Sequence, residues 1–455
     1  MHAIRRWLSV LRTLTPSRPH ALTPLLCLLL PTLATTAQAQ YTSPGSGMNI
    51  TPNRKEQLDR AIEDARWNLG PVRVQPWFGI SNISYRDNIP TAPVDASGQQ
   101  ATTDDVTATG GAGLKLYLPF ARDAGVLAAY AQPQYTWWNE LDERNQLLGN
   151  YGAGLFTFFG RLELEATATR TEHLEITTTE VLDQLPATID TLQAKSQVEV
   201  TSAIALAGSV SYSETSYDAE EGFDPALGLA ARALDRNTTT SRLSLRYLLK
   251  SNRGYLGAGV QVEETEFDSA FGNRGNDGES VFFEMLLRGN KMDLDLDLVE
   301  RDLQPTAGST FEGYEATTGR AAVVLRPGWR FDFRLYGSRS LQYSLVDADQ
   351  FFQEDRQGIG TGIELSSRMQ MTAFYEVGEN DYQGTLDGQL ARADEDLTAY
   401  GADLHIELGR NLGLRIGARQ TEIDSQNPLL DRELTEVTVG LSFGGIGWGG
   451  EGAGL

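Results

Sequence analysis

The clearest pattern in the chain is a strict alternation of apolar and acidic residues in MDLDLDL, at 292–298. A helix would scatter this pattern around its whole circumference. A strand sorts it onto two faces, because successive side chains of a strand point in opposite directions. The segment therefore predicts a strand with an apolar face, made by Met292 and three leucines, and a carboxylate face, made by Asp293, Asp295 and Asp297.

Shorter alternations of the same kind recur along the chain and predict further strands with one apolar and one polar side. They include LSLRYLL, YLGAGVQVEE, RFDFRLY, ADLHIEL and LGLRIGARQT. Short connections with turn residues are predicted at 121–125, 159–161, 205–207, 251–254, 288–291, 326–329, 366–368 and 409–413. Long polar connections are predicted at 86–105, 139–148, 174–194, 218–235, 268–278, 302–312, 346–356, 381–395 and 424–431.

The short and long connections alternate strictly along the chain. Eight short and nine long connections give eighteen strands, the first at 72–85, with sixteen as the alternative count. Short turns at one end and long loops at the other are typical of an outer-membrane barrel. We therefore predict an all-β fold, a closed antiparallel transmembrane β-barrel over 72–443. An even number of strands places both ends of the barrel on the periplasmic side.

A soluble sandwich or propeller is the alternative fold, because it also contains alternating strands. Its polar side would face water, however, and its connections would not sort so regularly by length. Lysine, which is common on water-facing surfaces, is scarce here, at positions 55, 115, 195, 250 and 291 only. Arginine supplies nearly all the positive charge, which suits fixed, hydrogen-bonded ion pairs.

Residues 1–39 have the three parts of an export signal. Four arginines make a basic region, ALTPLLCLLLPTLATTA supplies the apolar region, and AQA at 37–39 predicts cleavage after Ala39. The single cysteine, Cys27, lies in this leader, so the mature chain has neither a disulfide nor a cysteine metal site. A large exported protein without disulfides indicates a Gram-negative envelope.

A short helix is predicted at 52–68, within a periplasmic N-terminal segment at 40–71. Thr51 suits the N-cap, Pro52 the first helical position, and Gly70 the position just past the end. Three placements stay open: a lead-in against the barrel rim, a plug inside the pore, and a docking handle for a periplasmic partner.

The last strand, LTEVTVGLSF, ends at Phe443 and is followed by a glycine-rich tail at 444–455. This strand resembles the C-terminal signal that the outer-membrane barrel assembly machinery reads, although such signals usually end the chain. The assembly machinery is therefore one expected partner.

The charge balance excludes a nucleic-acid partner. Removing the four leader arginines leaves 34 basic against 61 acidic residues, a net charge of −27. A surface for nucleic acid needs the opposite sign. Acidic loops such as DAEEGFD and RADED suit divalent ions that bridge to lipopolysaccharide, so outer-membrane lipid and lipopolysaccharide are expected partners.

The polar parity of the strands predicts the lining of the lumen, because the apolar parity must face hydrocarbon. The predicted pore-lining acids are Glu263, Glu284, Asp293, Asp295, Asp297, Asp332, Glu364, Glu376, Asp403 and Glu407. The predicted pore-lining bases are Lys115, Arg242, Arg246, Arg288, Arg334, Arg415 and Arg419. Two roles stay open for them: an ion-pair lattice that stiffens the wall, and a field that orients polar solutes or favours cations.

Aromatic residues add two expectations. Those near strand ends predict an interfacial girdle, made by Trp77, Trp137, Tyr247, Tyr255, Trp329 and Tyr343. Those on the lumen parity would favour the sliding of sugars, and they are Trp138, Tyr336 and Phe374.

Enzymatic motifs are absent from the mature sequence. Its two histidines, His173 and His405, belong to no G-x-S-x-G or H-E-x-x-H pattern. The aspartates of 293–297 lack the glycine and bidentate acid of a calcium loop. We therefore predict no enzyme, no catalytic residue, no cofactor and no metal site, and a lumenal hydrolase is the least favoured alternative.

One family resemblance is carried by the opening strand, VQPWFGISNISYRDNI. Its end, Tyr85-Arg86-Asp87-Asn88, resembles the Tyr-x-Asp-Asn stretch of β-barrel porin-2-like proteins, and SVSYSETSYD at 209–218 is similar to their outgoing strands. The resemblance implies an outer-membrane barrel associated with exopolysaccharide production or export.

Two functional hypotheses follow from the barrel. The first is a porin-like channel for polar solutes, with polysaccharide export as a more specific form. The second is a structural or docking barrel of an envelope export complex, plugged by its own ion pairs, loops or helix 52–68. A periplasmic export partner or a polysaccharide would be the further partner in either case.

Overall fold

The computed structural model describes residues 54–90, 102–121, 124–178, 181–218, 231–249, 253–268, 273–328, 330–344, 350–383, 394–409, 412–425 and 431–443. The predicted leader, Thr51, Pro52 and the C-terminal tail lie outside these residues. The described chain is almost entirely β-strand, and its other elements include a helix near the N-terminus and a short 3-10 turn, η2 (Asp142–Arg144).

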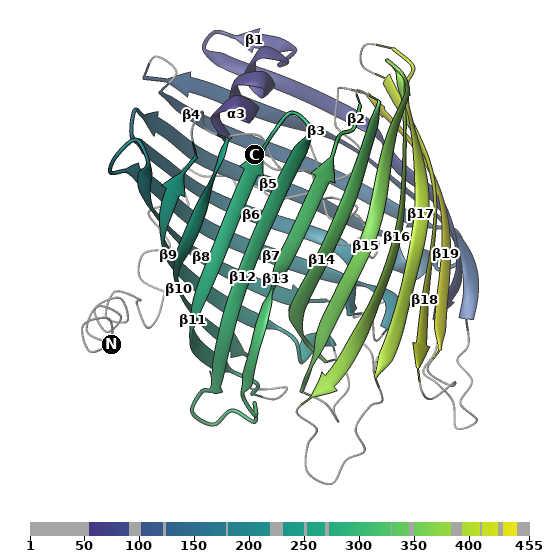
Figure 1. The fold of residues 1–455 in the computed structure, drawn as a ribbon. Coiled ribbons are helices and arrows are strands. Elements are labelled where there is room, and N and C mark those ends of the chain that lie inside the picture. The colour runs from purple at the N-terminus through teal and green to yellow at the C-terminus, as the bar shows by residue number, and fades with distance from the viewer. Residues whose placement is uncertain are drawn as a thin grey trace.

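The strands form one closed, antiparallel, up-and-down wall (Figure 1). Each barrel strand pairs with its neighbours in sequence, and the last strand closes the ring by pairing with the first. The bounds are β2 (Val72–Pro90), β3 (Thr102–Phe120), β4 (Gly125–Trp138), β5 (Gln146–Phe159), β6 (Leu162–Thr178), β7 (Val181–Glu199), β8 (Ile204–Tyr217), β9 (Arg236–Leu248), β10 (Gly254–Phe267), β11 (Asn276–Arg288), β12 (Met292–Pro305), β13 (Tyr314–Leu325), β14 (Phe331–Tyr343), β15 (Phe351–Ser366), β16 (Met369–Gln383), β17 (Glu395–Glu407), β18 (Leu412–Ser425) and β19 (Arg432–Phe443). The predicted closed barrel of eighteen strands is confirmed.

One predicted turn lies elsewhere. The short turn expected at 205–207 lies inside β8, and the chain turns at 200–203 instead. Thr201 closes this turn, because its hydroxyl accepts hydrogen bonds from the backbone N–H groups of Ala203 and Ile204. The small residues Ala205 and Ala207 resemble a turn in sequence, but they are buried in the barrel wall.

The predicted long loop at 174–194 is also wrong, because most of it is a strand hairpin. β6 continues to Thr178 and β7 begins at Val181, with a register that pairs His173 with Ala187. In the same way β2 extends past the predicted limit at 85 to Pro90. These strand ends are rich in threonine and acids because they extend beyond the apolar part of the wall, and polar composition alone made them look like loops.

The outer side of the wall carries a continuous apolar band. On β12 the outward residues run from Met292 to Leu298 and are then replaced by Glu300 and Asp302. The nearby strands β10, β11 and β13 change in the same way, at Glu264, Glu279 and Thr317. Such a band, with every strand hydrogen-bonded on both sides, is the condition for crossing hydrocarbon. The apolar parity of MDLDLDL therefore faces outward, as its alternation predicted.

The predicted aromatic girdle is only partly correct. Trp137 and Tyr247 lie on the outer side with 41% and 56% of their surface exposed, whereas Trp77 is 6% exposed and lies on the inner side. Its neighbour Phe78 takes the outward position, and a β-bulge between Ile80 and Asn82 resets the parity of the rest of β2. Trp329 lies outside the described residues.

Tyr255 and Tyr343 also depart from the girdle prediction. The ring of Tyr255 lies under the Arg246 guanidinium at 4.1 Å, on the inner side of the wall. Tyr343 packs edge-on against Phe267, with ring centroids 4.7 Å apart, and its hydroxyl accepts a hydrogen bond from Asn276. Both side chains therefore belong to inner packing and cannot contact lipid.

The N-terminal helix α3 (Arg54–Glu63) lies at the end of the barrel where the short turns are (Figure 1). It is shorter than the predicted helix at 52–68. Residues 67–69 form a further short strand, β1 (Trp67–Leu69), paired with β2. Gly70, expected just past the helix, has φ +64° and instead turns the β1–β2 hairpin.

Candidate functional site: the inner wall of the barrel

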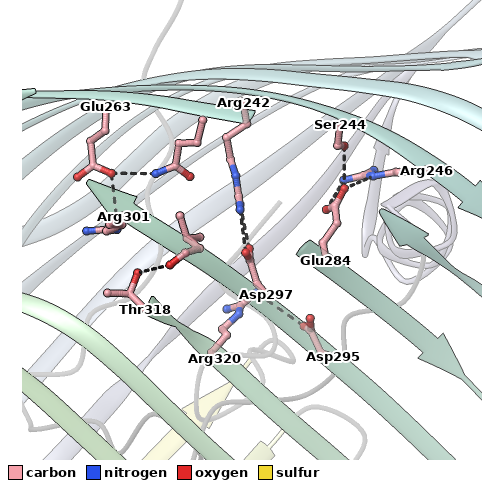
Figure 2. A network of polar contacts seen from close by, with 12 residues as sticks. Arg242, Ser244, Arg246, Glu263, Glu284, Asp295, Asp297, Arg301, Thr318 and Arg320 are labelled. Atoms are coloured by element: carbon pink, nitrogen blue, oxygen red, sulfur yellow. Dashed lines mark hydrogen bonds and ion pairs between the residues drawn. The ribbon is translucent and has the colours of Figure 1, made fainter. Parts of the chain in front are cut away.

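The aspartates of MDLDLDL lie on the inner side of β12, and each is paired with an arginine. Asp293 contacts Arg326 on the turn after β13 at 2.6 Å, and Asp295 lies 3.7 Å from Arg320. Asp297 accepts two hydrogen bonds from Arg242 of β9, at 2.8 and 2.7 Å (Figure 2). Of these three arginines only Arg242 was among the predicted pore-lining bases, and Arg320 and Arg326 were missed.

Arg242 reaches its partner by lying flat along the wall. It starts on β9, passes over β10 and β11, and ends at Asp297 on β12 (Figure 2). On the way its guanidinium stacks on the ring of Phe282, 4.0 Å from the centroid. The stack and the bidentate bond hold the cation against the wall, so it does not project into the lumen.

A second pair crosses the wall in the same manner. Arg246, Gly257 and Glu284 are directly opposite one another on β9, β10 and β11. Arg246 donates to both carboxylate oxygens of Glu284 at 2.7 and 2.8 Å, and also to Gln197. Ser244 donates a further hydrogen bond to Glu284 at 2.7 Å. A Cβ on Gly257 would stand 2.7 Å from the Glu284 side chain, so glycine leaves the path open.

Gly257→Ala is therefore expected to weaken this pair. The added methyl group displaces the Glu284 carboxylate from Arg246, and the free energy of unfolding should fall by about 1.5–3 kcal/mol, the usual contribution of a hydrogen bond to a charged group. The matched control is Gly360→Ala, whose Cβ would meet only ordinary contacts, at 3.5 Å or more. Guanidinium unfolding in lipid vesicles measures both variants, and equal stabilities would contradict the prediction.

Most of the remaining predicted charges face inward and contact neighbouring side chains. Arg301 lies 3.5 Å from Glu263, which also accepts a hydrogen bond from Gln261. Arg334 pairs with Asp332 at 3.0 Å, and Arg415 with Asp403 at 2.7 Å. Arg288 faces Asp293 across the β11–β12 pair, Lys115 lies over the Tyr130 ring, and Arg419 over Phe374. Glu364 and Glu407 are exposed at the short-turn end of the wall.

Two of the three aromatics proposed as a surface for sugars are buried. Trp138 is 1% exposed and packs among Leu174, Leu185 and their neighbours at the long-loop end. Tyr336 is 7% exposed and donates a hydrogen bond to Glu376 at 2.8 Å. Parity placed these rings inward correctly, but it could not show that other side chains cover them.

Sequence reasoning missed a second ion-pair network on β15–β19. Glu395, whose side chain is fully buried, receives both terminal nitrogens of Arg432, at 3.1 and 2.7 Å. Tyr382 and Asn380 donate to the same carboxylate. Arg356, equally buried, bonds Glu354 and the Asn380 side chain. The acids of this network sit among predicted loops, at 346–356 and 381–395, so no strand alternation marked them as inward.

Helix α3 packs on the inner side of the wall at the short-turn mouth. Leu58, 2% exposed, contacts a cluster of inward side chains from β3, β4 and β5, made by Tyr117, Val126, Ala128 and Phe156. Arg54 donates to both oxygens of Glu165 on β6, each at 3.2 Å, and lies over the Phe156 ring. The sequence left three placements open for this helix: against the barrel rim, as a plug in the pore, or as a docking handle. Because the helix is held inside the mouth, the geometry favours the plug.

Among the described residues, no helix has the length and apolar character needed to cross a membrane. In the same residues, no group of three or more His, Cys, Asp and Glu side chains is arranged to hold a metal ion.

Replacing Asp293, Asp295 and Asp297 together by asparagine is expected to shift ion selectivity towards anions. The substitution removes three negative charges and leaves Arg326, Arg320 and Arg242 uncompensated. The reversal potential across a planar bilayer under a KCl gradient measures the shift. Asp302→Asn is the control, because it removes an acid from the outer side of the same strand. An unchanged reversal potential in the triple variant would mean that these three aspartates do not line a conducting path.

Comparison with known proteins gives only distant structural likeness. No family model and no curated protein matches the sequence. Among solved structures, Acinetobacter baumannii OccAB3 is 12% identical with a TM-score of 0.45, covering 81% of this chain and 99% of that chain. A BenF-like porin from Pseudomonas fluorescens Pf-5 is 11% identical with a TM-score of 0.48, covering 81% and 98%. Pseudomonas aeruginosa OccK2 (OpdF), in complex with glucuronate, is 11% identical with a TM-score of 0.46, covering 81% and 97%. Likeness this low carries no inference about the solutes of this chain.

Proposed function

We propose that this chain is a porin-like channel for polar solutes in a Gram-negative outer membrane. The observation that carries the proposal is the closed eighteen-strand wall, apolar on its outer side and lined inside by charged and polar side chains. Barrels of sixteen to eighteen strands are wide enough to enclose an aqueous channel. The proposal assigns no enzymatic reaction to the chain.

The ion pairs of β9 to β13 support a channel whose fixed positive and negative charges largely compensate one another. Two of its arginines, Arg242 and Arg246, lie flat against the wall through bidentate bonds and ring stacking. Such a wall is stiff and polar without filling the lumen with long, free side chains. The sequence left two roles open for these charges: an ion-pair lattice that stiffens the wall, and a field that orients polar solutes or favours cations. The same residues are compatible with both roles.

A plugged docking barrel is the second candidate, and α3 is the observation that favours it. The helix occupies part of the short-turn mouth and is fixed there by Leu58 and by the Arg54–Glu165 pair. In this form the barrel would serve an envelope export complex, with a periplasmic partner that binds or moves the helix. Polysaccharide export remains a more specific form of the channel proposal. Its aromatic support is reduced, because Trp138 and Tyr336 are covered.

The partners expected from sequence remain proposals as well. The outward acids that replace the apolar band on β10 to β13 include Glu264, Glu300 and Asp302, where lipopolysaccharide headgroups and their divalent ions would lie. Phe443 ends the last barrel strand, as the barrel assembly machinery prefers, and its ring stacks on Phe78 at 4.7 Å.

Planar-bilayer recording of the mature, full-length protein tests the proposed function. An open channel gives discrete current steps in KCl, and its current falls when neutral polymers small enough to enter are added. A protein that inserts into the bilayer, as protease protection of the strands would show, but never gives steps would contradict the channel and favour the plugged barrel.

A further inference from the structure

The ladder between β13 and β14 stops partway along the wall, at Gly319 opposite Arg339. Beyond that point, in the described part of the chain, residues 314–318 of β13 pair only with β12, and residues 340–343 of β14 pair only with β15. Leu298, the last apolar residue on the outer side of β12, lies opposite Gly319. The two strands therefore separate where the apolar band ends, towards the long loops.

Gly319 explains where the separation begins. Its φ of +145° is a backbone conformation that side chains with a Cβ rarely adopt, and a Cβ there would overlap the backbone oxygen of Asp297. Only glycine takes this conformation without strain. The chain can therefore change direction at Gly319 while its ladder with β12 continues.

Beyond the separation, the end of the β14–β15 hairpin lies on the inner side of other strands. On β14, Leu335 faces outward with 47% of its surface exposed, and Tyr343 has the same parity. The Tyr343 ring nevertheless packs against Phe267, an inward residue of β10, with ring centroids 4.7 Å apart. Its hydroxyl accepts a hydrogen bond from Asn276, an inward residue of β11. The wall therefore overlaps itself here, with the hairpin end tucked inside.

An apolar contact holds the overlap together. Phe351, at the start of β15, is 2% exposed and packs against Phe311 and Tyr314, with ring centroids 5.1 and 5.6 Å apart. Leu303, on the inner side of β12, and Leu341 of β14 belong to the same cluster. Side-chain packing thus takes the place of the backbone ladder between the ends of β13 and β14.

Arg274 and Gln350 add polar bonds across the overlap. Arg274, just before β11, donates to the backbone oxygens of Ser344 and Gln350 at 2.6 and 3.2 Å. The Gln350 side chain accepts a hydrogen bond from the Glu312 N–H at 3.0 Å and donates one to the Thr310 oxygen. A few side chains therefore fasten the hairpin end to β11 and to the segment between β12 and β13.

We propose that this hairpin end, residues 340–344 and 350–354, is a gate that moves between the tucked position and a position in line with β13. In line, the register of the β13–β14 ladder continues, and both strands gain backbone hydrogen bonds. Tyr343 and Phe351, which the tucked position keeps from lipid, then turn outward to the membrane interface, where aromatic rings are common. Both positions satisfy the same residues in different ways, which is the condition for a two-state element.

The position of the gate decides the width of the long-loop mouth. The tucked end lies inside the wall and narrows the mouth, and the aligned end leaves it open. This effect on current rests on the proposed channel. It adds to that channel a second control point, at the mouth opposite to helix α3.

Introduced cysteines can detect the movement, because the only natural cysteine, Cys27, lies in the predicted leader. The gate pair is Ala316→Cys with Gln342→Cys. In the tucked position Ala316 packs against the side of the hairpin end that carries Leu341, and Gln342 has the opposite parity, so the hairpin backbone separates the two. In the aligned position the continued register places them directly opposite each other, within reach of a disulfide.

The control pair is Arg320→Cys with Ser338→Cys, which lies directly opposite within the existing ladder. The full-length protein in lipid nanodiscs is oxidised with copper phenanthroline, and the loss of free thiols is followed over time. Both pairs are expected to close, the control pair first and the gate pair more slowly. In planar bilayers the oxidised gate pair should conduct more than the reduced pair, with fewer transitions between levels, and dithiothreitol should reverse the change.

Arg274→Gln, combined with the gate pair, tests the polar fastening. It removes the charged donor to Ser344 and Gln350 and should speed closure of the gate pair about tenfold, the usual contribution of a hydrogen bond from a charged group. Lys291→Gln removes a positive charge from the turn between β11 and β12, at the other end of the wall, and should leave the rate unchanged.

A gate pair that stays reduced while the control pair closes would overturn the inference, because the hairpin end then never leaves the tucked position. Closure as fast as that of the control pair would overturn it too, because the overlap would then not hold. Closure without a change in current would refute the gating. Crosslinking needs no current, so a gate pair that closes in a protein without current steps would refute the channel and establish the movement.

Discussion

Deleting residues 41–69 is expected to raise the single-channel conductance. The deletion removes α3, whose Leu58 side and Arg54 hold it against the inner wall of the short-turn mouth. A helix is about 10 Å across, and an eighteen-strand wall with strands about 4.8 Å apart leaves a mouth only a few times wider. The current should therefore rise by about one tenth or more, and a mouth fully closed by the helix would change from silent to conducting.

A point variant gives the same test without shortening the chain. Leu58→Asp places a charge in the buried contact with Tyr117, Val126 and Phe156, and should release the helix and raise the conductance as the deletion does. Glu56→Gln is the control, because Glu56 lies on the exposed side of the helix and pairs with Arg60 one turn along. If neither the deletion nor Leu58→Asp changes the current, the helix does not obstruct the conduction path.

Glu395→Gln is expected to destabilise the barrel strongly, and by more than Gly257→Ala does. The Glu395 side chain is fully buried, and the substitution leaves the Arg432 guanidinium, only 12% exposed, without its counter-charge. Removing one partner of a buried ion pair costs about 3–5 kcal/mol in the free energy of unfolding. Tyr382 and Asn380 also lose an ionised acceptor.

Guanidinium unfolding of the protein in lipid vesicles, followed by tryptophan fluorescence, measures this loss. The exposed neighbour provides the control, since Glu433→Gln should change stability by less than about 0.5 kcal/mol. The double variant Glu395→Gln with Arg432→Met removes both charges and should recover part of the loss. A Glu395→Gln barrel as stable as the Glu433→Gln barrel would show that the pair is accessible to solvent.

The alternation of MDLDLDL predicted both the strand and the side to which each residue points. The inward placement of the charged residues on β9 to β18 followed from the same signal, whereas the count of eighteen strands followed from the order of short and long connections. It failed where alternation is weak or interrupted. Small alanines at 205 and 207 resembled a turn, and the polar ends of β6 and β7 resembled a loop. The girdle assignment of Trp77 rested on its nearness to a strand end, and that position does not decide on which side of the wall a ring lies.

The pairing of the charges was beyond the reach of the sequence. Arg242 and Asp297 lie 55 positions apart and on strands separated by two others, so only the register of β9 to β12 brings them together. The same holds for Arg54 and Glu165, whose contact places the N-terminal helix inside the mouth. Parity is a local property, because each residue's side of a strand depends only on its neighbours. The partner of a side chain depends on how distant strands align and on which side chains cover others. The sequence alone therefore determined a membrane barrel with a charged interior, and the tertiary structure decided which charges compensate and which aromatics are hidden.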